Sequence, residues 1–325
     1  MILNEHGKTG KRAFLSSHPP ILHYMIDNVQ VNFNPEQLTL LNFCLAFLMF
    51  GVALDLKIDH FKMLYRQPKI PIVGFISQII LLPLLTIGLI FLFKPPVSIA
   101  LGMLLVSVCP GGNVSNFATH LAKGNVALSV LMTSMSTLMA IITTPLLFSL
   151  LTPLIPGGKE FQQEIYVSPL DMIGTTVKLI LIPLIIGMLL NYRFPTFTKR
   201  LLKPVQVLSL LIFFGFVIVA IYGNWDNITN YLHLVFFIVL VNNGLALLLG
   251  YSFAKLNRLP LYDAKAIAFE TGIHNSGLGL ILIFNFFNGL GGMAMIAAWW
   301  GVWHLISGAA LAFYWRKRGD KAKGS

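Results

Sequence analysis

Long apolar runs separated by short polar stretches dominate this chain. A helix needs roughly 20 apolar residues to cross about 30 Å of hydrocarbon. Nine runs approach or exceed that length, at about 37–54, 70–93, 97–121, 124–151, 170–191, 202–223, 230–255, 261–288 and 292–316. None shows the alternation of a barrel strand. The pattern therefore predicts an all-α polytopic membrane protein with about nine transmembrane helices.

Composition and charge support a membrane protein. Of the 325 residues, 56% are hydrophobic and 11% are charged, which is more apolar surface than a soluble domain can cover. The net charge of +11 sits in short clusters between the runs, as in cytoplasmic loops. We therefore expect membrane lipids as partners, and no nucleic acid. Cys44 and Cys109 lie inside apolar runs and are predicted to be core residues.

The basic residues predict the orientation. One set of alternate loops and the C-terminal "RKRGDKAK" (316–323) carry most of the lysines and arginines, and such loops face the cytoplasm. We therefore expect a cell-membrane protein (inner or plasma membrane) with an extracytoplasmic N-terminal arm, residues 1–36, and a basic cytoplasmic tail, residues 317–325. The arm has no apolar core before "HPP", which argues against a cleaved signal peptide.

Two runs are interrupted. In 97–121 the break is "CPGGNVSN" (109–116), where Pro110 removes a backbone donor and two glycines favour other geometry. In 261–288 the break lies around Thr271 to Asn275. Each interrupted helix is followed by one more span. This arrangement predicts inverted repeats, 37–151 with four spans and 165–316 with five, whose discontinuous helices cross near the midplane.

Glu270 is the one acidic residue that the pattern places deep within a span. A charged group at that depth costs a few kcal/mol or more, so it requires a partner or water. One reading is a protonated, hydrogen-bonded structural glutamate. The other is a cation site, in which unwound backbone and side-chain oxygens complete the shell of a hard cation. The oxygens nearest in the pattern belong to Ser115, Asn116, Ser129 and Thr133. Gln78 and His304 are weaker signals, each equally compatible with structure or function.

Three motifs resemble the bile acid:sodium symporter family. They are "CPGGNVSNFATHLAKGNVALSVLMTSMSTL" (109–138), "FETGIHNSGL" (269–278) and "VWHLISGAALAFYW" (302–315), and the similarity runs from about Asn42 to Trp315. The resemblance implies a core domain, in which two interrupted helices cross, packed against a smaller panel domain. It also implies two sodium ions at the crossing. The nine runs resemble the animal members, whereas bacterial members often have ten spans.

The resemblance also implies roles for individual residues. The first sodium site would use Ser115, Asn116, Ser129, Thr133 and Glu270. The second would use Gln78, Glu270, the backbone of Thr271 and Ile273, and His274. The substrate would lie beside Asn113, Asn275 and His304. Two positions depart from the family: glutamine is usual where this chain has His274, and some bacterial members have asparagine at the position of Leu305.

These observations favour sodium-coupled symport of an organic anion, a bile acid or related carboxylate, by alternating access. The half-helix N-termini near Val114 and Asn275 suit a carboxylate. A cation/proton antiporter and a proton-coupled anion carrier with the same crossed helices remain alternatives. A passive channel would not need so costly an acid. An intramembrane enzyme is disfavoured, because no HExxH spacing and no second deep carboxylate occur. The identity of the anion stays open.

Overall fold

The computed structural model describes residues 35–54, 67–165, 167–222 and 225–321. In this part of the chain nearly every residue is helical, and the one β-bridge outside helices joins Gly111 to His274. Five helical stretches are long and apolar enough to cross a membrane by themselves: Lys69–Phe93, Val126–Leu154, Pro169–Arg193, His233–Leu256 and Gly291–Lys317. The prediction of an all-α polytopic membrane protein is confirmed for these residues.

The helix bounds lie close to the predicted runs. The helices are α2 (Pro35–Ala53), α4 (Lys69–Phe75), α5 (Leu82–Phe93), α6 (Val97–Val108), α7 (Val114–Leu121), α8 (Val126–Leu151), α9 (Gly158–Glu164), α10 (Pro169–Thr176), α11 (Ile182–Arg193), α12 (Pro195–Tyr222), α13 (Trp225–Leu256), α14 (Leu261–Gly272), α15 (Ser276–Phe286) and α16 (Gly291–Lys321). The helix α16 extends into the expected tail, and α9 is a short helix that the hydrophobic pattern did not predict. The predicted N-terminal arm falls almost wholly outside the described residues.

Two spans contain a π-helical turn. In the first, Ile76–Leu81 joins α4 to α5; in the second, Val177–Leu181 joins α10 to α11. A π turn places an extra residue in the helix and commonly marks a functional position. The turn at Ile76–Leu81 contains Ser77 and Gln78, and both side chains are buried.

Both predicted breaks are present, and both are shorter than expected. The first covers residues 109–113. Cys109 has extended backbone, as the residue before a proline prefers, whereas Ser115 and Asn116 already belong to α7. The second covers residues 273–275, so that Thr271 lies in the last turn of α14 and not in the break. Asn275 caps α15 by accepting a hydrogen bond from the Leu278 amide at 3.0 Å.

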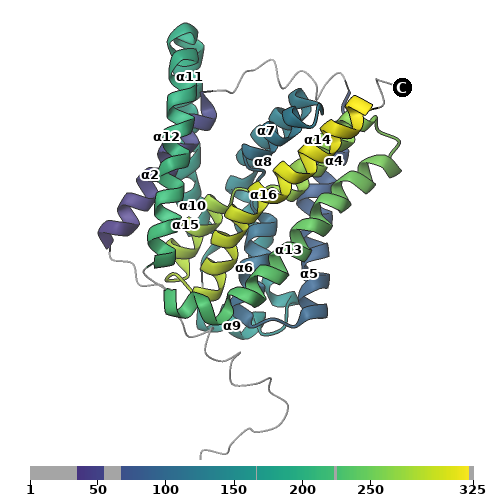
Figure 1. Cartoon of the computed structure of the whole chain (residues 1–325). Helices are drawn as coiled ribbons and strands as arrows, with labels where there is room; N and C mark the ends of the chain where they lie inside the picture. Colours follow the sequence, from purple (N-terminus) through teal and green to yellow (C-terminus); the bar gives the residue numbers. More distant parts are fainter. Residues whose placement is uncertain (1–34, 55–66, 166, 223–224, 322–325) are drawn as a thin grey trace, which may run out of the picture.

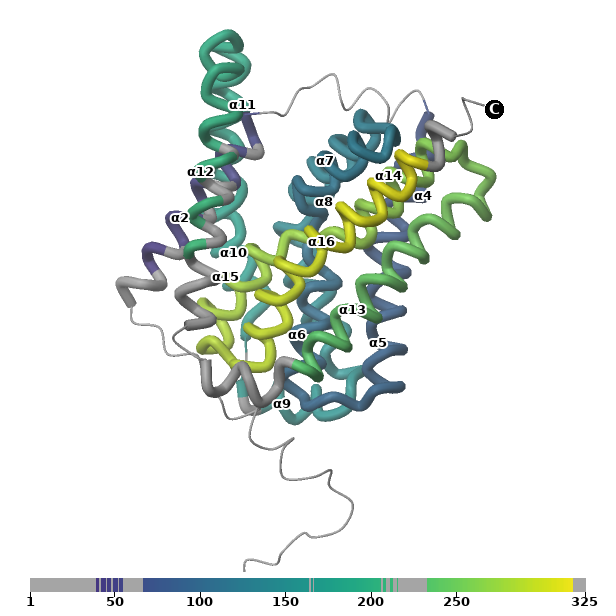
Figure 2. The backbone as a smooth tube through the Cα atoms, in the orientation of Figure 1, coloured from purple at the N-terminus to yellow at the C-terminus, as the bar shows by residue number. Residues whose placement is uncertain are grey.

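The half-helices pair across the breaks. Figures 1 and 2 show α6 and α15 toward one end of the molecule and α7 and α14 toward the other, and the members of each pair contact one another. The chain therefore passes through the two breaks in opposite directions. Helices α2, α11 and α12 contact each other and lie together on the left of Figure 1.

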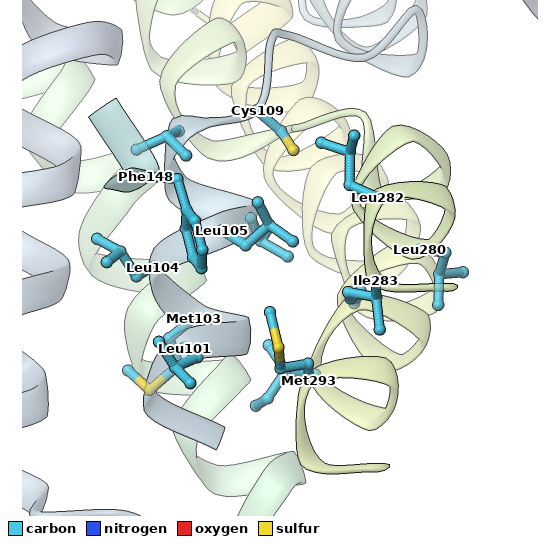
Figure 3. Packing of buried hydrophobic residues seen from close by; sticks show 14 of the residues in the cluster. Leu101, Met103, Leu104, Leu105, Cys109, Phe148, Leu280, Leu282, Ile283 and Met293 are labelled. Atoms are coloured by element: carbon cyan, nitrogen blue, oxygen red, sulfur yellow. The ribbon is translucent and has the colours of Figure 1, made fainter. Parts of the chain in front are cut away.

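The largest buried apolar cluster lies beside the breaks. Leu101, Leu104 and Leu105 of α6 pack in one cluster with Leu282 and Ile283 of α15. Figure 3 shows Leu105 of α6 facing Leu282 and Ile283 of α15, with Cys109 at the end of the cluster where the first break begins. Both cysteines are free. Cys109 is buried, as the sequence predicted, whereas Cys44 on α2 is only half-buried and is not a core residue.

Candidate functional site

The two helix breaks are hydrogen-bonded directly to each other. The Gly112 amide donates to the Ile273 carbonyl at 3.0 Å, and the Asn275 amide donates to the Pro110 carbonyl at 2.8 Å. Between these bonds, Gly111 and His274 form the antiparallel bridge. The unwound segments therefore satisfy part of each other's backbone, as apolar surroundings require, and the ends of four half-helices converge on one place.

This close approach depends on the absence of side chains at Gly111 and Gly112. A Cβ atom on Gly111 would lie 2.5 Å from Glu270 Oε2, and one on Gly112 would lie 3.0 Å from the His274 carbonyl oxygen. Glycine is the residue that permits such contacts between backbone and a neighbouring group. The "GG" of the first motif therefore determines how near Glu270 and the second break come to the first.

Three hydroxyl groups donate hydrogen bonds to one oxygen of Glu270. Ser129 lies 2.5 Å and Thr133 lies 2.8 Å from Oε1, and Ser115 also donates to it. Ser129 and Thr133 are one turn apart on α8, and Ser115 comes from α7. Asn116 reaches the same cluster through a hydrogen bond from Thr133 at 3.3 Å. The structure thus brings together all five residues predicted for the first site.

The other oxygen of Glu270 has no hydrogen-bond partner among the described residues, although the side chain is 0% exposed. It lies beside Gly111, and the amide nitrogen of Gln78 is 3.2 Å from the Cβ position of the same glycine. Neither polar atom of Gln78 has a partner within the described chain. Gln78 also lines a cavity of about 10 Å³ with Cys109, Pro110 and Ser136, room for about one water molecule.

The remaining residues predicted for the second site lie at the end of α14. The Thr271 hydroxyl is hydrogen-bonded to the Ser77 hydroxyl at 2.9 Å and to the Ile267 carbonyl. Only the backbone carbonyl of Thr271 is therefore left as a ligand for an ion. The Ile273 carbonyl already accepts one hydrogen bond from Gly112. The His274 ring is buried, and neither of its nitrogens has a hydrogen-bond partner in the described chain. The Trp300 ring packs edge-on against it, with 6.0 Å between the ring centres.

The predicted substrate residues lie in the two breaks and on α16. Asn113 precedes α7 without capping it through its side chain. Asn275 caps α15 and reaches the sulfur of Met49 on α2 at 4.0 Å. His304 on α16 is buried, its Nδ1 atom has no partner among the described residues, and it is close enough to His274 to interact with it electrostatically.

Four supporting hydroxyl and amide groups were not predicted. Ser77 holds Thr271, Thr119 donates to Ser129 at 3.3 Å, and Ser136 accepts the Gly111 amide at 3.1 Å. Asn243 of α13 donates a hydrogen bond at 2.7 Å to the carbonyl of Gly272, which is the last residue of α14. The helical spacing from a predicted member marks Thr119 (four after Ser115) and Ser136 (three after Thr133), whereas nothing in the pattern identifies Ser77 or Asn243.

The chain is similar in sequence to known sodium-dependent transporters. The model of the sodium bile acid symporter family matches residues 42–231. A Bacillus subtilis (strain 168) protein described as "uncharacterized sodium-dependent transporter YocS" is 40% identical over 280 residues, 85% of this chain and 83% of the relative. The probable sodium/metabolite cotransporter BASS2 of rice chloroplasts is 34% identical, over 85% of this chain and 63% of its own length. The human ileal sodium/bile acid cotransporter is 29% identical, over 74% and 67%.

These relatives are transporters and not enzymes, in keeping with the expectation from the sequence. The family model covers more than half of the chain, and the bacterial relative is similar over nearly the whole of both sequences. The chain therefore belongs to the sodium bile acid symporter family.

Proposed function

We propose that this protein is a secondary active transporter that couples the entry of sodium ions to the uptake of a small organic anion by alternating access. The observation that carries the proposal is Glu270. Its carboxylate is fully buried where four half-helices meet, with one oxygen surrounded by hydroxyl groups and the other without a partner in the described chain. A buried carboxylate of this kind requires a cation or a proton.

The first sodium position lies at Glu270 Oε1. Its oxygens come from Ser115, Asn116, Ser129, Thr133 and Glu270, which are hydrogen-bonded to one another in the structure. A hydroxyl group is both donor and acceptor. When sodium enters, the hydroxyl hydrogens turn away and the lone pairs face the ion. The same five oxygens then change from a hydrogen-bonded cluster to a coordination shell for a hard cation.

The second sodium position lies at Glu270 Oε2. The oxygen of Gln78, the carboxylate oxygen and the carbonyls of Thr271 and Ile273 are suited to a hard cation, and the first two have no other partner among the described residues. The Ile273 carbonyl has a second lone pair free for an ion. His274 contributes nitrogen in place of an amide oxygen, which makes this position the weaker one.

The substrate position lies beside Asn113, Asn275 and His304. The amide groups of these asparagines and the N-terminal ends of α7 and α15 favour an anionic group such as a carboxylate. Asn275 also approaches Met49 of α2, so the substrate would lie between the crossing helices and the group formed by α2, α11 and α12. The names of the rice and human relatives, a metabolite and a bile acid cotransporter, support a bile acid or a related carboxylate.

The architecture we propose has nine spans, as two inverted repeats at 37–151 and 165–316, with a core domain that contains both broken helices. The mutual contacts of α2, α11 and α12 support a separate panel domain. In the cell membrane, the N-terminus lies outside and the C-terminus inside, as the basic loops indicate.

Coupling follows from the position of Glu270 between elements. A sodium ion at Oε1 contacts α7, α8 and α14 at once, so it stabilises the arrangement of the two breaks that forms the substrate position. Sodium thereby raises substrate affinity, and the substrate raises sodium affinity by the same factor. Each net positive charge carried inward gains about 2.3 kcal/mol per 100 mV of membrane potential.

The test is transport by the purified full-length protein in proteoliposomes. Thermal-shift measurements on a panel of carboxylates, with sodium or with potassium, select the anion. Uptake of that anion is then measured under an inward sodium gradient. We expect accumulation that requires sodium and collapses when the gradient is dissipated. Equal uptake with a potassium gradient, or sodium/proton exchange without any anion, would exclude symport.

A further inference from the structure

A second buried acid lies on α14, two turns before Glu270. Asp263 is 0% exposed. One of its oxygens accepts a hydrogen bond from the Asn125 side chain at 2.7 Å, and the other is buried without a partner among the described residues. The two acids are seven positions apart, which corresponds to about two helical turns, or roughly 10 Å. Asp263 and Glu270 therefore lie on the same face of α14.

Polar side chains connect the two acids. Asn125, the N-cap of α8, precedes Ser129 and Thr133 of that helix at intervals of four residues. Asn125 contacts Asp263, and Ser129 and Thr133 contact Glu270. On α7, the Thr119 hydroxyl donates to Ser129 at 3.3 Å, and its side chain is fully buried. Polar side chains of α7, α8 and α14 thus extend from the proposed sodium position at Glu270 to Asp263. This end of the row lies near the loop that contains Lys123, which is predicted to face the cytoplasm.

The basic groups nearby are already engaged. Lys265 donates to the Ala122 carbonyl at 2.7 Å, at the end of α7, and lies 6.0 Å from the centre of the Trp315 ring. Its ammonium group is therefore directed to the carbonyl end of α7 and to α16. No ion pair that would neutralise Asp263 is found in the described chain. A helix-end acid that only served the α14 dipole would remain in contact with water, as Asp171 does at the same position of α10.

We propose that Asp263, with Asn125, is a transient cation site through which sodium passes between Glu270 and the cytoplasm. This inference rests on the proposed function. Sodium leaves the hydroxyl cluster along Ser129 and Thr119 and reaches the unpartnered oxygen of Asp263 before it is hydrated. The negative charge lowers the barrier for an ion that would otherwise cross about 10 Å of poorly hydrated protein. A charge about 10 Å from the bound ion also favours that ion at equilibrium, by roughly tenfold in affinity at an effective dielectric constant of about 20. Its loss alone would therefore speed dissociation, so slower dissociation in spite of weaker affinity identifies a role on the path.

The experiment uses ²²Na⁺ and the full-length protein in detergent. Equilibrium binding gives the sodium affinity, and dilution into unlabelled sodium gives the dissociation rate. For Asp263→Asn, which keeps an oxygen that can accept the Asn125 hydrogen bond, we expect the dissociation rate to fall about fivefold or more even though the affinity weakens by up to about tenfold. Asp171→Asn removes an exposed acid from the equivalent position of α10 and is the matched control, with both quantities unchanged.

Two further variants separate charge from structure. In the double variant Asn125→Asp with Asp263→Asn, the carboxylate moves across a 2.7 Å hydrogen bond, so the dissociation rate should recover. Asn125→Ala keeps the carboxylate but removes its hydrogen bond and the side-chain cap of α8, so it should slow dissociation less than Asp263→Asn does. The inference is wrong if sodium dissociates from Asp263→Asn as fast as from Asp171→Asn or faster, or if only Asn125→Ala slows dissociation. A wild-type protein that binds no ²²Na⁺ would instead overturn the proposed function.

Discussion

At the scale of single residues, the site depends on how the two oxygens of Glu270 are used. Oε1 is surrounded by three hydroxyl groups, and Oε2 faces Gly111 and Gln78. One carboxylate can therefore ligate two ions, one at each oxygen, and the other ligands differ between the two positions. The following substitutions separate the contributions of these positions.

Removal of one oxygen from the first position should weaken sodium binding without unfolding the protein. Thr133→Ala removes a hydroxyl that lies 2.8 Å from Glu270, and contacts to a charged group contribute about 1.5–3 kcal/mol, or roughly ten- to a hundredfold in affinity. Asn116→Ala should have a smaller effect in the same direction, because Asn116 reaches the cluster through Thr133. Sodium titration of thermal stability measures both. Ser134→Ala, one residue along α8, removes a hydroxyl that bonds only its own helix and should change little.

Gly111→Ala should weaken sodium binding by steric conflict. The new methyl group would lie 2.5 Å from Glu270 Oε2, and forced overpacking of this kind costs about 1–3 kcal/mol. We expect sodium affinity to fall at least about tenfold, because the carboxylate must move away from the breaks. Gly88→Ala on α5 adds the same methyl group where no atom lies within 4 Å and is the matched control. Equal affinities in the two variants would show that Glu270 does not act from this position.

His274 should make the second position sensitive to pH. The titratable groups near its unpartnered ring are Glu270 and His304, and histidine is the side chain that changes charge near neutrality. We expect protonation of His274 to compete with sodium. The variant His274→Gln should bind sodium more tightly at low pH. Its sodium affinity should also depend much less on pH than that of the wild type between about pH 5.5 and 8.5. Parallel curves for the two proteins would place His274 outside the ion site. A loss of proton-coupled uptake in the variant would favour the proton-coupled alternative.

At the scale of helices, neighbouring elements hold the breaks in register. Asn243 of α13 donates to the last carbonyl of α14 and accepts from Ser307 of α16 at 2.6 Å. The carbonyl end of α14 is thereby fixed by two other helices. Such a group positions Glu270 and Ile273 without contact to an ion.

Asn243→Ala should therefore lower both stability and sodium affinity. Loss of a buried hydrogen-bond partner leaves the Gly272 carbonyl unsatisfied at a cost of about 1–3 kcal/mol, and the α14 end becomes less well placed for the ion. Asn242→Ala, at the adjacent and equally buried position, contacts Thr86 and not the breaks. It should lower stability while sodium affinity stays within about twofold. If both variants lose affinity in proportion to stability, Asn243 has no positioning role.

Much at this scale could be predicted from the sequence. Apolar runs gave the helices, and proline with paired glycines gave the first break. The exact limits could not be predicted: Ser115, Asn116 and Thr271 are helical because hydrogen bonds between the two breaks replace a longer unwound stretch. The π turn that presents Ser77 and Gln78 has no sequence signal in an apolar run. The burial of Asp263 was also missed, because a helix-end acid is normally exposed and its cover comes from α8, distant in the sequence.

At the scale of the whole molecule, the proposed orientation assigns loops to opposite sides of the membrane. Lys159 and Lys199 are both exposed, one in α9 and the other at the start of α12, and the distribution of basic residues predicts opposite sides for them. With Cys44 and Cys109 replaced by serine, Lys159→Cys should react with an impermeant maleimide on intact cells, and Lys199→Cys only after permeabilisation. The reverse result would invert the orientation and direct the Asp263 path to the outside.

The central claim is that Glu270 binds sodium, and equilibrium binding of ²²Na⁺ to Glu270→Ala tests it most directly. The substitution removes both oxygens, so that neither position keeps its shared ligand, and the neutral side chain relieves the cost of a buried charge. We expect a folded, monodisperse protein in detergent whose ²²Na⁺ binding is lost, whereas Asp171→Asn binds as the wild type does. Retained ²²Na⁺ binding by Glu270→Ala at wild-type affinity would contradict the account.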